Sequence, residues 1–181
     1  MKTKNMVLTG MFTAVLAVLS IIQIPMPSGV PITLQTFAVA LCGYVLGSKM
    51  GALSTFLYVL IGTVGVPVFA GMSAGIRVLV GPTGGFLFGF IPMAFLIGLS
   101  LKNNSKILPF VWGILGLAVC HLLGAIQFAI VTKTGFVASL LLVSVPYLVK
   151  DVLSVAGAVF VAIAIRRGLA RANLMYNEQA A

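Results

Sequence analysis

Long apolar segments, separated by short stretches that hold most of the charged residues, dominate this sequence of 181 residues. Hydrophobic residues make up 61% of the chain and charged residues only 7%, and the mean hydropathy is +1.21. A soluble globular domain normally carries about 25% charged residues. The pattern therefore predicts an integral membrane protein.

Six of the apolar segments are predicted to be transmembrane helices, so the chain is expected to be an all-α membrane protein with one domain over residues 1–181. A helix needs about 20 residues to cross the apolar layer, and the second and third segments are shorter than that. An eight-residue apolar segment, Phe136 to Val143, is predicted to lie at the membrane interface. The six predicted spans are Met6 to Ile24, Ile32 to Leu46, Gly51 to Val66, Thr83 to Leu101, Pro109 to Thr132 and Val145 to Ile165.

The positive charges predict the orientation of these helices, because cytoplasmic loops carry an excess of Lys and Arg. With the N-terminus in the cytoplasm, three of the 11 Lys and Arg residues fall outside or near the outer surface: Arg77, Lys133 and Lys150. The other eight fall inside: Lys2, Lys4, Lys49, Lys102, Lys106, Arg166, Arg167 and Arg171. Both termini are therefore predicted to be cytoplasmic, and the loops Pro25 to Pro31, Pro67 to Pro82 and Lys133 to Ser144 to be external.

Several classes of protein are disfavoured by the same composition. The net charge of +9 lies in loops and tails between apolar segments, so it is expected to set topology rather than to bind nucleic acid. Cys42 and Cys120 fall inside apolar segments and are predicted to be small buried side chains. No Gly-rich phosphate-binding loop is present, so the chain itself is not expected to hydrolyse ATP. With one His and two acidic residues, we expect no enzyme, cofactor or metal site.

Asp151 is the strongest candidate for a functional residue, since it lies in an otherwise apolar segment. An ionisable group there is costly and usually faces a cavity, a bundle interior or a partner. Tyr147, Lys150, Asp151 and Ser154 are spaced so that all four share one helical face near the outer end of the last span. The alternative is a structural ion pair in which Lys150 extends toward the interface.

The segment GPTGGFLFGF, from Gly81 to Phe90, predicts a helix start at the outer surface. The amides of Thr83, Gly84 and Gly85 are expected to be free there and to suit a carboxylate or carbonyl oxygen. Gly81, Gly85 and Gly89 also form a ridge that permits close approach of either a ligand or another helix.

Further polar residues are weaker candidates. Arg77, in an external loop, is expected to bind a substrate carboxylate or to contact only water and lipid phosphate. Gln127, at the end of a stripe of small residues, is expected to contact substrate or another helix. Gln35 is expected to cap the second span or to line the outer cavity. His121 is predicted to be a packing residue, because no carboxylate is expected to partner it at its depth.

Small residues also line the first predicted span in two rows. One row contains Thr9, Thr13 and Ala17, and the other contains Gly10 and Ala14. Such rows allow another helix to approach closely, either inside the bundle or in a partner protein.

Three phrases, TLQTFAV, PVFAG and GPTGG, occur here in the order in which they occur in the BioY family, which the chain resembles from about Met6 to Arg166. The resemblance implies a six-helix S component of an energy-coupling factor (ECF) transporter, which captures biotin with high affinity from outside a bacterial cell membrane. It also implies two kinds of partner, an EcfT-type transmembrane coupling protein and two ATP-binding cassette ATPase subunits that drive transport.

Asp151 matches an Asp in the last helix of this family, and the resemblance implies that it accepts the ureido N–H groups of biotin. Family members commonly carry a Lys three positions later, where this chain has Ser154, whereas Lys150 precedes the Asp. Lys150 is therefore a candidate either for the biotin carboxylate or for keeping Asp151 ionised. Other expected carboxylate ligands are Arg77 and the amides after Pro82. Further substrate contacts are expected from Tyr147, Gln127 and Thr83.

The resemblance also bears on the apolar and partner-facing residues. Phe69 and Phe86 are expected to form apolar walls for the ring and chain of biotin. The small residues of the first helix resemble the surface by which S components meet the coupling protein, which favours partner contact for Gly10 and Ala14. Thr13 and Ala17 are also expected to contribute to that surface.

A different class of function is the main alternative. The chain would then be a stand-alone proton-coupled secondary transporter of a small solute that bears a carboxylate, with Asp151 or His121 carrying the proton. Such carriers often contain repeated halves and broken helices, and no repeat is evident here.

Overall fold

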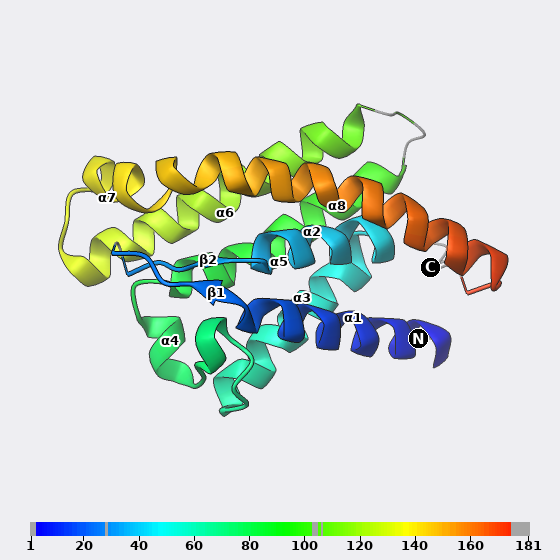
Figure 1. Ribbon diagram of the computed structural model, residues 1–181, viewed down its shortest axis with the longest axis horizontal. Helices are drawn as coiled ribbons and strands as arrows, with labels where there is room; N and C mark the ends of the chain where they lie inside the picture. The colour runs from blue at the N-terminus through cyan, green and yellow to red at the C-terminus, as the bar shows by residue number, and fades with distance from the viewer. Residues whose placement is uncertain (1–2, 28, 103–104, 106, 175–181) are drawn as a thin grey trace.

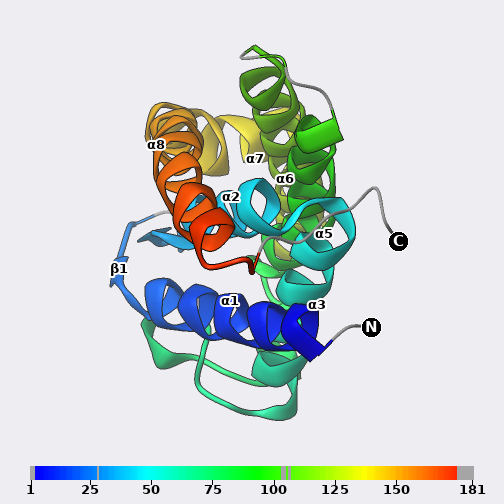
Figure 2. The ribbon, with the colours of Figure 1, turned by 90° about the vertical axis from the view of Figure 1, so that its right-hand side faces the viewer.

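The computed structural model describes residues 3–27, 29–102, 105 and 107–174 (Figures 1 and 2). Lys2 and Lys106, which the topology prediction uses, lie outside the described residues. The helices are α1 (Thr3–Ile21), α2 (Gln35–Leu46), α3 (Ser48–Val64), η1 (Ala70–Met72), α4 (Ile76–Val80), α5 (Gly84–Leu99), η2 (Ser100–Lys102), α6 (Leu108–Thr132), α7 (Phe136–Val143) and α8 (Val145–Arg171). The strands are β1 (Gln23–Ile24) and β2 (Ile32–Thr33).

The chain is a predominantly helical membrane protein. Four helices are long and apolar enough to cross a membrane: α1, α5 extended by η2, α6 and α8. The helices α2 and α3 are also apolar but have only 12 and 17 residues. All six predicted spans are helical over most of their length, and α7 coincides with the predicted interfacial segment.

The first predicted span is wrong at its end. The helix ends at Ile21 instead of reaching Ile24, because Gln23 and Ile24 pair antiparallel with Thr33 and Ile32. A short two-stranded sheet therefore joins α1 to α2, so the fold is not entirely α-helical. The long loop after α3 also contains local structure, the short helices η1 and α4.

The ends of the bundle differ in structure. The start of α1 and the end of α8 lie at one end, whereas α4 and α7 lie at the other (Figure 1). Viewed along the bundle, α1 and α8 lie on different sides of α2, with α5 and α6 to the right of α2 (Figure 2). The described parts of α1 and α8 therefore begin and end on the same side of the molecule.

Close packing of α5 on α6 explains the glycine ridge. A Cβ atom at Gly89 would lie 2.8 Å from Cys120 Cα, and one at Gly85 would lie 2.8 Å from Gln127 Cβ. Real Cβ atoms do not approach so closely, so larger residues would force the helices apart. Of the two roles considered for the ridge, helix packing is the one that these two glycines fulfil.

A buried cluster of hydroxyl groups attaches α1 to α3; we call Thr9, Thr13 and Ser54 the hydroxyl cluster. The Thr13 hydroxyl contacts Ser54 Oγ at 3.1 Å and the Ser54 carbonyl at 3.2 Å, and Ser54 Oγ donates to the Thr9 carbonyl at 3.3 Å. Thr13 is only 6% exposed, so the prediction that it contacts a partner protein is wrong. Ala17 is half-buried against the core.

Gly10 and Ala14 lie on the other face of α1 and are exposed. Because both residues are exposed, a partner helix could contact them, and the partner interface stays a prediction.

The loop between α3 and α5 folds back on α3. Phe69 is 1% exposed and its ring meets Tyr58 edge to face, with ring centroids 5.5 Å apart. The Phe69 ring also fills the space beside Gly62, and Gly75 N–H donates to the Gly62 carbonyl at 2.8 Å. These contacts position the loop as one wall of the site described next.

Candidate ligand-binding site

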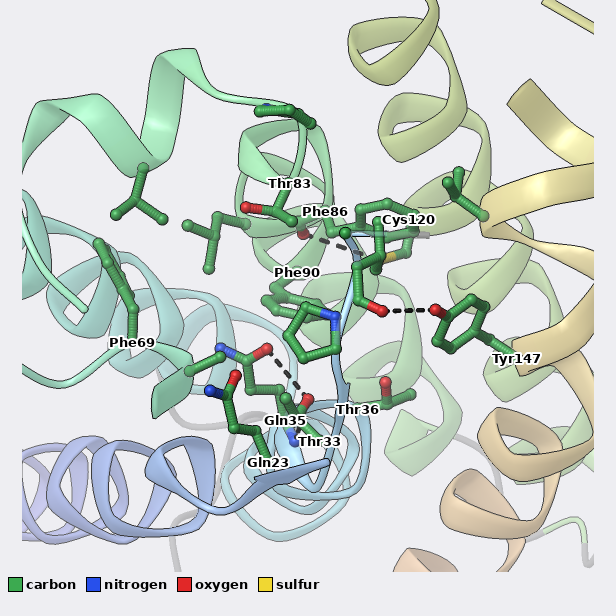
Figure 3. A pocket seen from close by; sticks show the side chains of 18 of the residues that line it. Gln23, Thr33, Gln35, Thr36, Phe69, Thr83, Phe86, Phe90, Cys120 and Tyr147 are labelled. Carbon is green, nitrogen blue, oxygen red and sulfur yellow. Dashed lines mark hydrogen bonds between the residues drawn. The ribbon is translucent and has the colours of Figure 1, made fainter. Parts of the chain in front are cut away.

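A cavity of about 370 Å³ lies among α2, α5, α6 and α8, and is bordered by the β1–β2 hairpin and by the loop before α5 (Figure 3). This volume falls in the range of pockets for small organic ligands. Its lining residues are Gln23, Gly29, Val30, Pro31, Thr33, Gln35, Thr36, Phe69, Ala70, Ser73, Arg77, Val78, Gly81, Pro82, Thr83, Phe86, Leu87, Phe90, Leu117, Cys120, His121, Val143, Tyr147, Lys150 and Asp151.

Three ionisable side chains form one corner of the cavity; we call Lys150, Asp151 and His121 the acid–base cluster. Asp151 Oδ2 lies 3.2 Å from His121 Nε2, and Asp151 Oδ1 forms an ion pair with Lys150 Nζ. Asp151 and His121 are 5% and 6% exposed. A buried carboxylate between two basic groups is strongly favoured over an isolated one.

The prediction for His121 assumed that no carboxylate lies at its depth. The structure differs, because Asp151 lies beside the His121 ring. The prediction considered spacing along single helices, whereas this pair joins α6 to α8. A usable signal was present: ionisable groups inside apolar segments tend to pair with one another, and these two are among very few in the chain.

Lys150 has two interactions. Besides its ion pair with Asp151, its Nζ donates to the Thr33 carbonyl at 3.1 Å. Its side chain is 27% exposed and lines the cavity. Lys150 therefore connects Asp151 to the β1–β2 hairpin, so the structure shows the predicted ion pair and keeps the amine beside the space for a ligand.

Tyr147 also holds the hairpin segment. Its hydroxyl donates to the Val30 carbonyl, and its ring is buried beside Val143 and Phe128 (Figure 3). Ser154, predicted to share this helical face, is half-buried and is not among the lining residues.

Gln35 lines the cavity, but its amide is already engaged. Its Nε2 donates to Tyr58 Oη at 2.8 Å, and its Oε1 accepts from the Thr33 hydroxyl at 3.1 Å (Figure 3). Thr36, one residue further, faces the cavity and its hydroxyl interacts with the Asp151 carboxylate.

Two predicted contact residues lie behind the cavity wall. Gln127 Nε2 donates to the carbonyls of Leu79 and Gly81, at 2.5 and 2.8 Å, so its amide supports the turn before α5. Gly84 is buried, and its N–H donates to the Gly81 carbonyl at 3.2 Å, so the prediction of a free amide there is wrong. Neither residue is among those that line the cavity, whereas Thr83 is.

Arg77 projects from α4 and lines the cavity while remaining exposed. Within the part of the chain that the structure describes, no hydrogen bond or ion pair of its guanidinium is found. It places a positive charge on a different element from the acid–base cluster.

Aromatic and aliphatic side chains form the remaining walls. Phe69 and Phe86, both predicted, are joined by Phe90 from the next turn of α5 and by Leu117 from α6 (Figure 3). The Phe86 and His121 rings meet edge to face, with centroids 5.8 Å apart and planes at 89°. The cavity thus combines a charged corner with apolar walls, which suits an amphipathic small molecule.

Both the sequence and the fold of the chain are similar to those of known proteins. The model of the BioY family matches residues 1–171. A biotin transporter of Thermotoga maritima is 46% identical over 125 residues, covering 67% of this chain and 72% of that protein. A probable biotin transporter of Pyrococcus horikoshii is 38% identical over 162 residues, covering 90% and 96%.

A solved structure, the S-component for biotin from an ECF-type ABC transporter, has the same fold. It aligns with a TM-score of 0.84 over 92% of each chain, at 24% identity. The named relatives are transporters rather than enzymes. The family match over nearly the whole chain and the extent of the Pyrococcus alignment lead to one conclusion: this chain belongs to the BioY family.

Proposed function

We propose that the chain captures biotin in this cavity as the substrate-binding S component of an ECF transporter. The observation that carries the proposal is the cavity itself. It has a charged corner at Asp151, aromatic walls from α5, and further polar groups on other elements. The names of its relatives and the matching fold support the same ligand.

Biotin and the cavity are chemically complementary. The ureido ring has two N–H donors and one carbonyl acceptor, and the acid–base cluster offers a carboxylate acceptor beside the Lys150 donor. The thiophane ring and the valeryl chain suit the walls formed by Phe86, Phe90 and Leu117.

The carboxylate of biotin needs a different end of the cavity. Asp151 would repel it, so we assign it to the side of Arg77 and Thr83, which line the cavity from α4 and from the turn before α5. An Arg guanidinium can bind a carboxylate through two parallel hydrogen bonds.

Transport requires partners that supply energy. We propose an EcfT-type coupling protein, contacted through the exposed residues Gly10 and Ala14, and two ATPase subunits. In this arrangement α2 and α3 complete six membrane crossings in a cell membrane, with both termini in the cytoplasm. The excess of Lys and Arg on that side supports the orientation.

Calorimetric titration of the purified chain with biotin in detergent tests the ligand assignment. We expect saturable binding, and desthiobiotin should keep much of the affinity because it retains both the ureido group and the carboxylate. Absence of biotin binding by a folded, monodisperse sample would refute the proposal.

Uptake into vesicles tests the energy source. We expect accumulation that needs ATP and the partner subunits. Uptake by this chain alone, driven by a pH gradient, would instead support a proton-coupled carrier in which Asp151 or His121 carries the proton.

A further inference from the structure

We propose that Gln23 is a specificity-determining residue, whose side-chain amide donates to the carboxylate of the ligand beside Arg77. The inference deepens the proposed function and rests on it, because it assumes a ligand with an acidic end. It gives the site a second element that recognises this end, the β1–β2 hairpin.

The strand register directs the Gln23 side chain toward the cavity. Gln23 pairs with Thr33, and side chains of directly paired residues lie on the same face of a sheet. The Thr33 hydroxyl donates to Gln35 Oε1, and all three side chains line the cavity (Figure 3). Ile24, the next residue of β1, faces the other way, since successive side chains of a strand alternate. It is 62% exposed and is not among the lining residues.

Gly71 allows the Gln23 amide to pack against the loop that carries Arg77. A Cβ atom at Gly71 would overlap Gln23 Nε2, so the amide lies directly on the backbone of η1. Gly71 also has a φ of 62°, in the left-handed region that favours glycine. The hairpin and the loop between α3 and α5 therefore meet at this contact, and α4 with Arg77 follows η1 in the same loop.

The two ends of the cavity differ in exposure. At the inner end, Asp151 and His121 are only 5% and 6% exposed. Gln23 and Arg77 line the same cavity but are exposed, so they belong to its outer end. An ionised carboxylate loses less hydration at the outer end, and Asp151 would repel it at the inner end. The acidic end of a ligand is therefore favoured beside Gln23 and Arg77.

Both of these outer side chains have unused donors. Within the part of the chain that the structure describes, the Gln23 amide has no hydrogen bond, as is also true of the Arg77 guanidinium. A carboxylate accepts about four hydrogen bonds, and a guanidinium supplies two of them when it binds as a fork. An amide N–H of Gln23 can supply another, and it forms a stronger bond to an ionised acceptor than to a neutral one. Gln23 should therefore distinguish an acid from its neutral amide.

Calorimetry with two ligands tests this assignment. The probes are biotin and biotin amide, in which a neutral group replaces the carboxylate. In Gln23→Glu the new carboxylate repels that of biotin, and we expect ~10-fold weaker binding of biotin but a change of ~2-fold or less for the amide. Gln23→Met removes the donor without adding a charge, so biotin should bind only ~3-fold more weakly. The matched control is Ile24→Glu, which places the same charge on the opposite face of β1 and should leave both affinities unchanged.

A ligand of opposite charge separates this effect from any loss of folding. An analogue of biotin that ends in a primary amine should bind Gln23→Glu more tightly than it binds the wild type, because its ammonium can pair with the new carboxylate. Equal losses of biotin and biotin amide in Gln23→Glu, unchanged affinity for all three ligands, or the same loss of biotin in Ile24→Glu would overturn the inference. Failure of the folded wild type to bind either biotin or its amide would instead refute the proposed function on which the inference rests.

Discussion

The hydroxyl cluster and the acid–base cluster are both buried, and they differ in what their hydrogen bonds leave unused. In the hydroxyl cluster, Thr13 and Ser54 bond to each other and to backbone carbonyls of α1 and α3. In the acid–base cluster, the ionisable side chains line a cavity, and His121 Nδ1 has no partner among the described residues.

This difference separates structural polar groups from binding groups. Both clusters are buried and both join separate helices, so burial alone does not identify a site. Unused hydrogen-bonding capacity beside an open volume does, because a ligand can supply the missing partners. We therefore expect substitutions in the acid–base cluster to change affinity and those in the hydroxyl cluster to change stability.

The largest expected effect is that of Asp151→Asn. The substitution keeps the size of the side chain but removes its charge, and hydrogen bonds to a charged group contribute about 1.5–3 kcal/mol. We expect biotin to bind ~100-fold more weakly by calorimetry. Ser154→Ala, one turn further along α8 and outside the cavity lining, is the control and should bind normally. Unchanged affinity in Asp151→Asn would remove the assigned ureido contact.

A smaller loss is expected for Lys150→Met. Met keeps the apolar stem but cannot pair with Asp151 or donate to the Thr33 carbonyl, so the hairpin loses one of its attachments to α8. We expect ~10-fold weaker binding, measured in the same titration. Lys49→Met changes an exposed Lys of α3 and serves as the control. If both variants bind like the wild type, Lys150 neither contributes to ligand binding nor holds Asp151 in a state that binds the ligand.

Gln127→Leu should have an indirect and weaker effect. The amide of Gln127 supports the turn before α5 through two backbone carbonyls, without lining the cavity. Loss of that support should weaken binding by ~5-fold and reduce the protection of amide hydrogens in residues 79–84 from exchange. A loss as large as that of Asp151→Asn would mean that Gln127 contacts the ligand directly.

Thr13→Val is expected to leave biotin affinity unchanged, which makes it the counterpart of the substitutions in the acid–base cluster. It preserves shape and removes one hydroxyl, and hydrogen bonds between helices in a membrane contribute about 0.6 kcal/mol on average. A slightly lower thermal unfolding temperature in detergent is therefore expected. A clear loss of affinity would show that the two clusters are not separate in function.

The sequence predicted the helices well because apolar segments and loop charges carry that information directly. All six spans and the interfacial segment correspond to helices, and Asp151, Lys150, Tyr147, Thr83, Arg77, Gln35 and Phe86 all line one cavity. These predictions needed only the spacing of residues within a segment.

Relations between segments were harder to predict. Three features depend on which helix or loop lies opposite. They are the pairing of His121 with Asp151, the strand pairing that ends α1 early, and the hydrogen bonds from Gln127 to the turn before α5. Thr13 and Gly10 belong to small rows on the same helix, yet Thr13 is buried and Gly10 is exposed. Spacing defines a row, whereas the neighbouring helices determine which row they cover.

The most direct test of the account is an experimental structure of the chain with biotin bound. The account predicts the ureido ring at the acid–base cluster, with an N–H group on Asp151, and the carboxylate of biotin near Arg77. A ligand bound in the reverse direction, with its carboxylate on Lys150 and its ureido ring near Arg77, would contradict it.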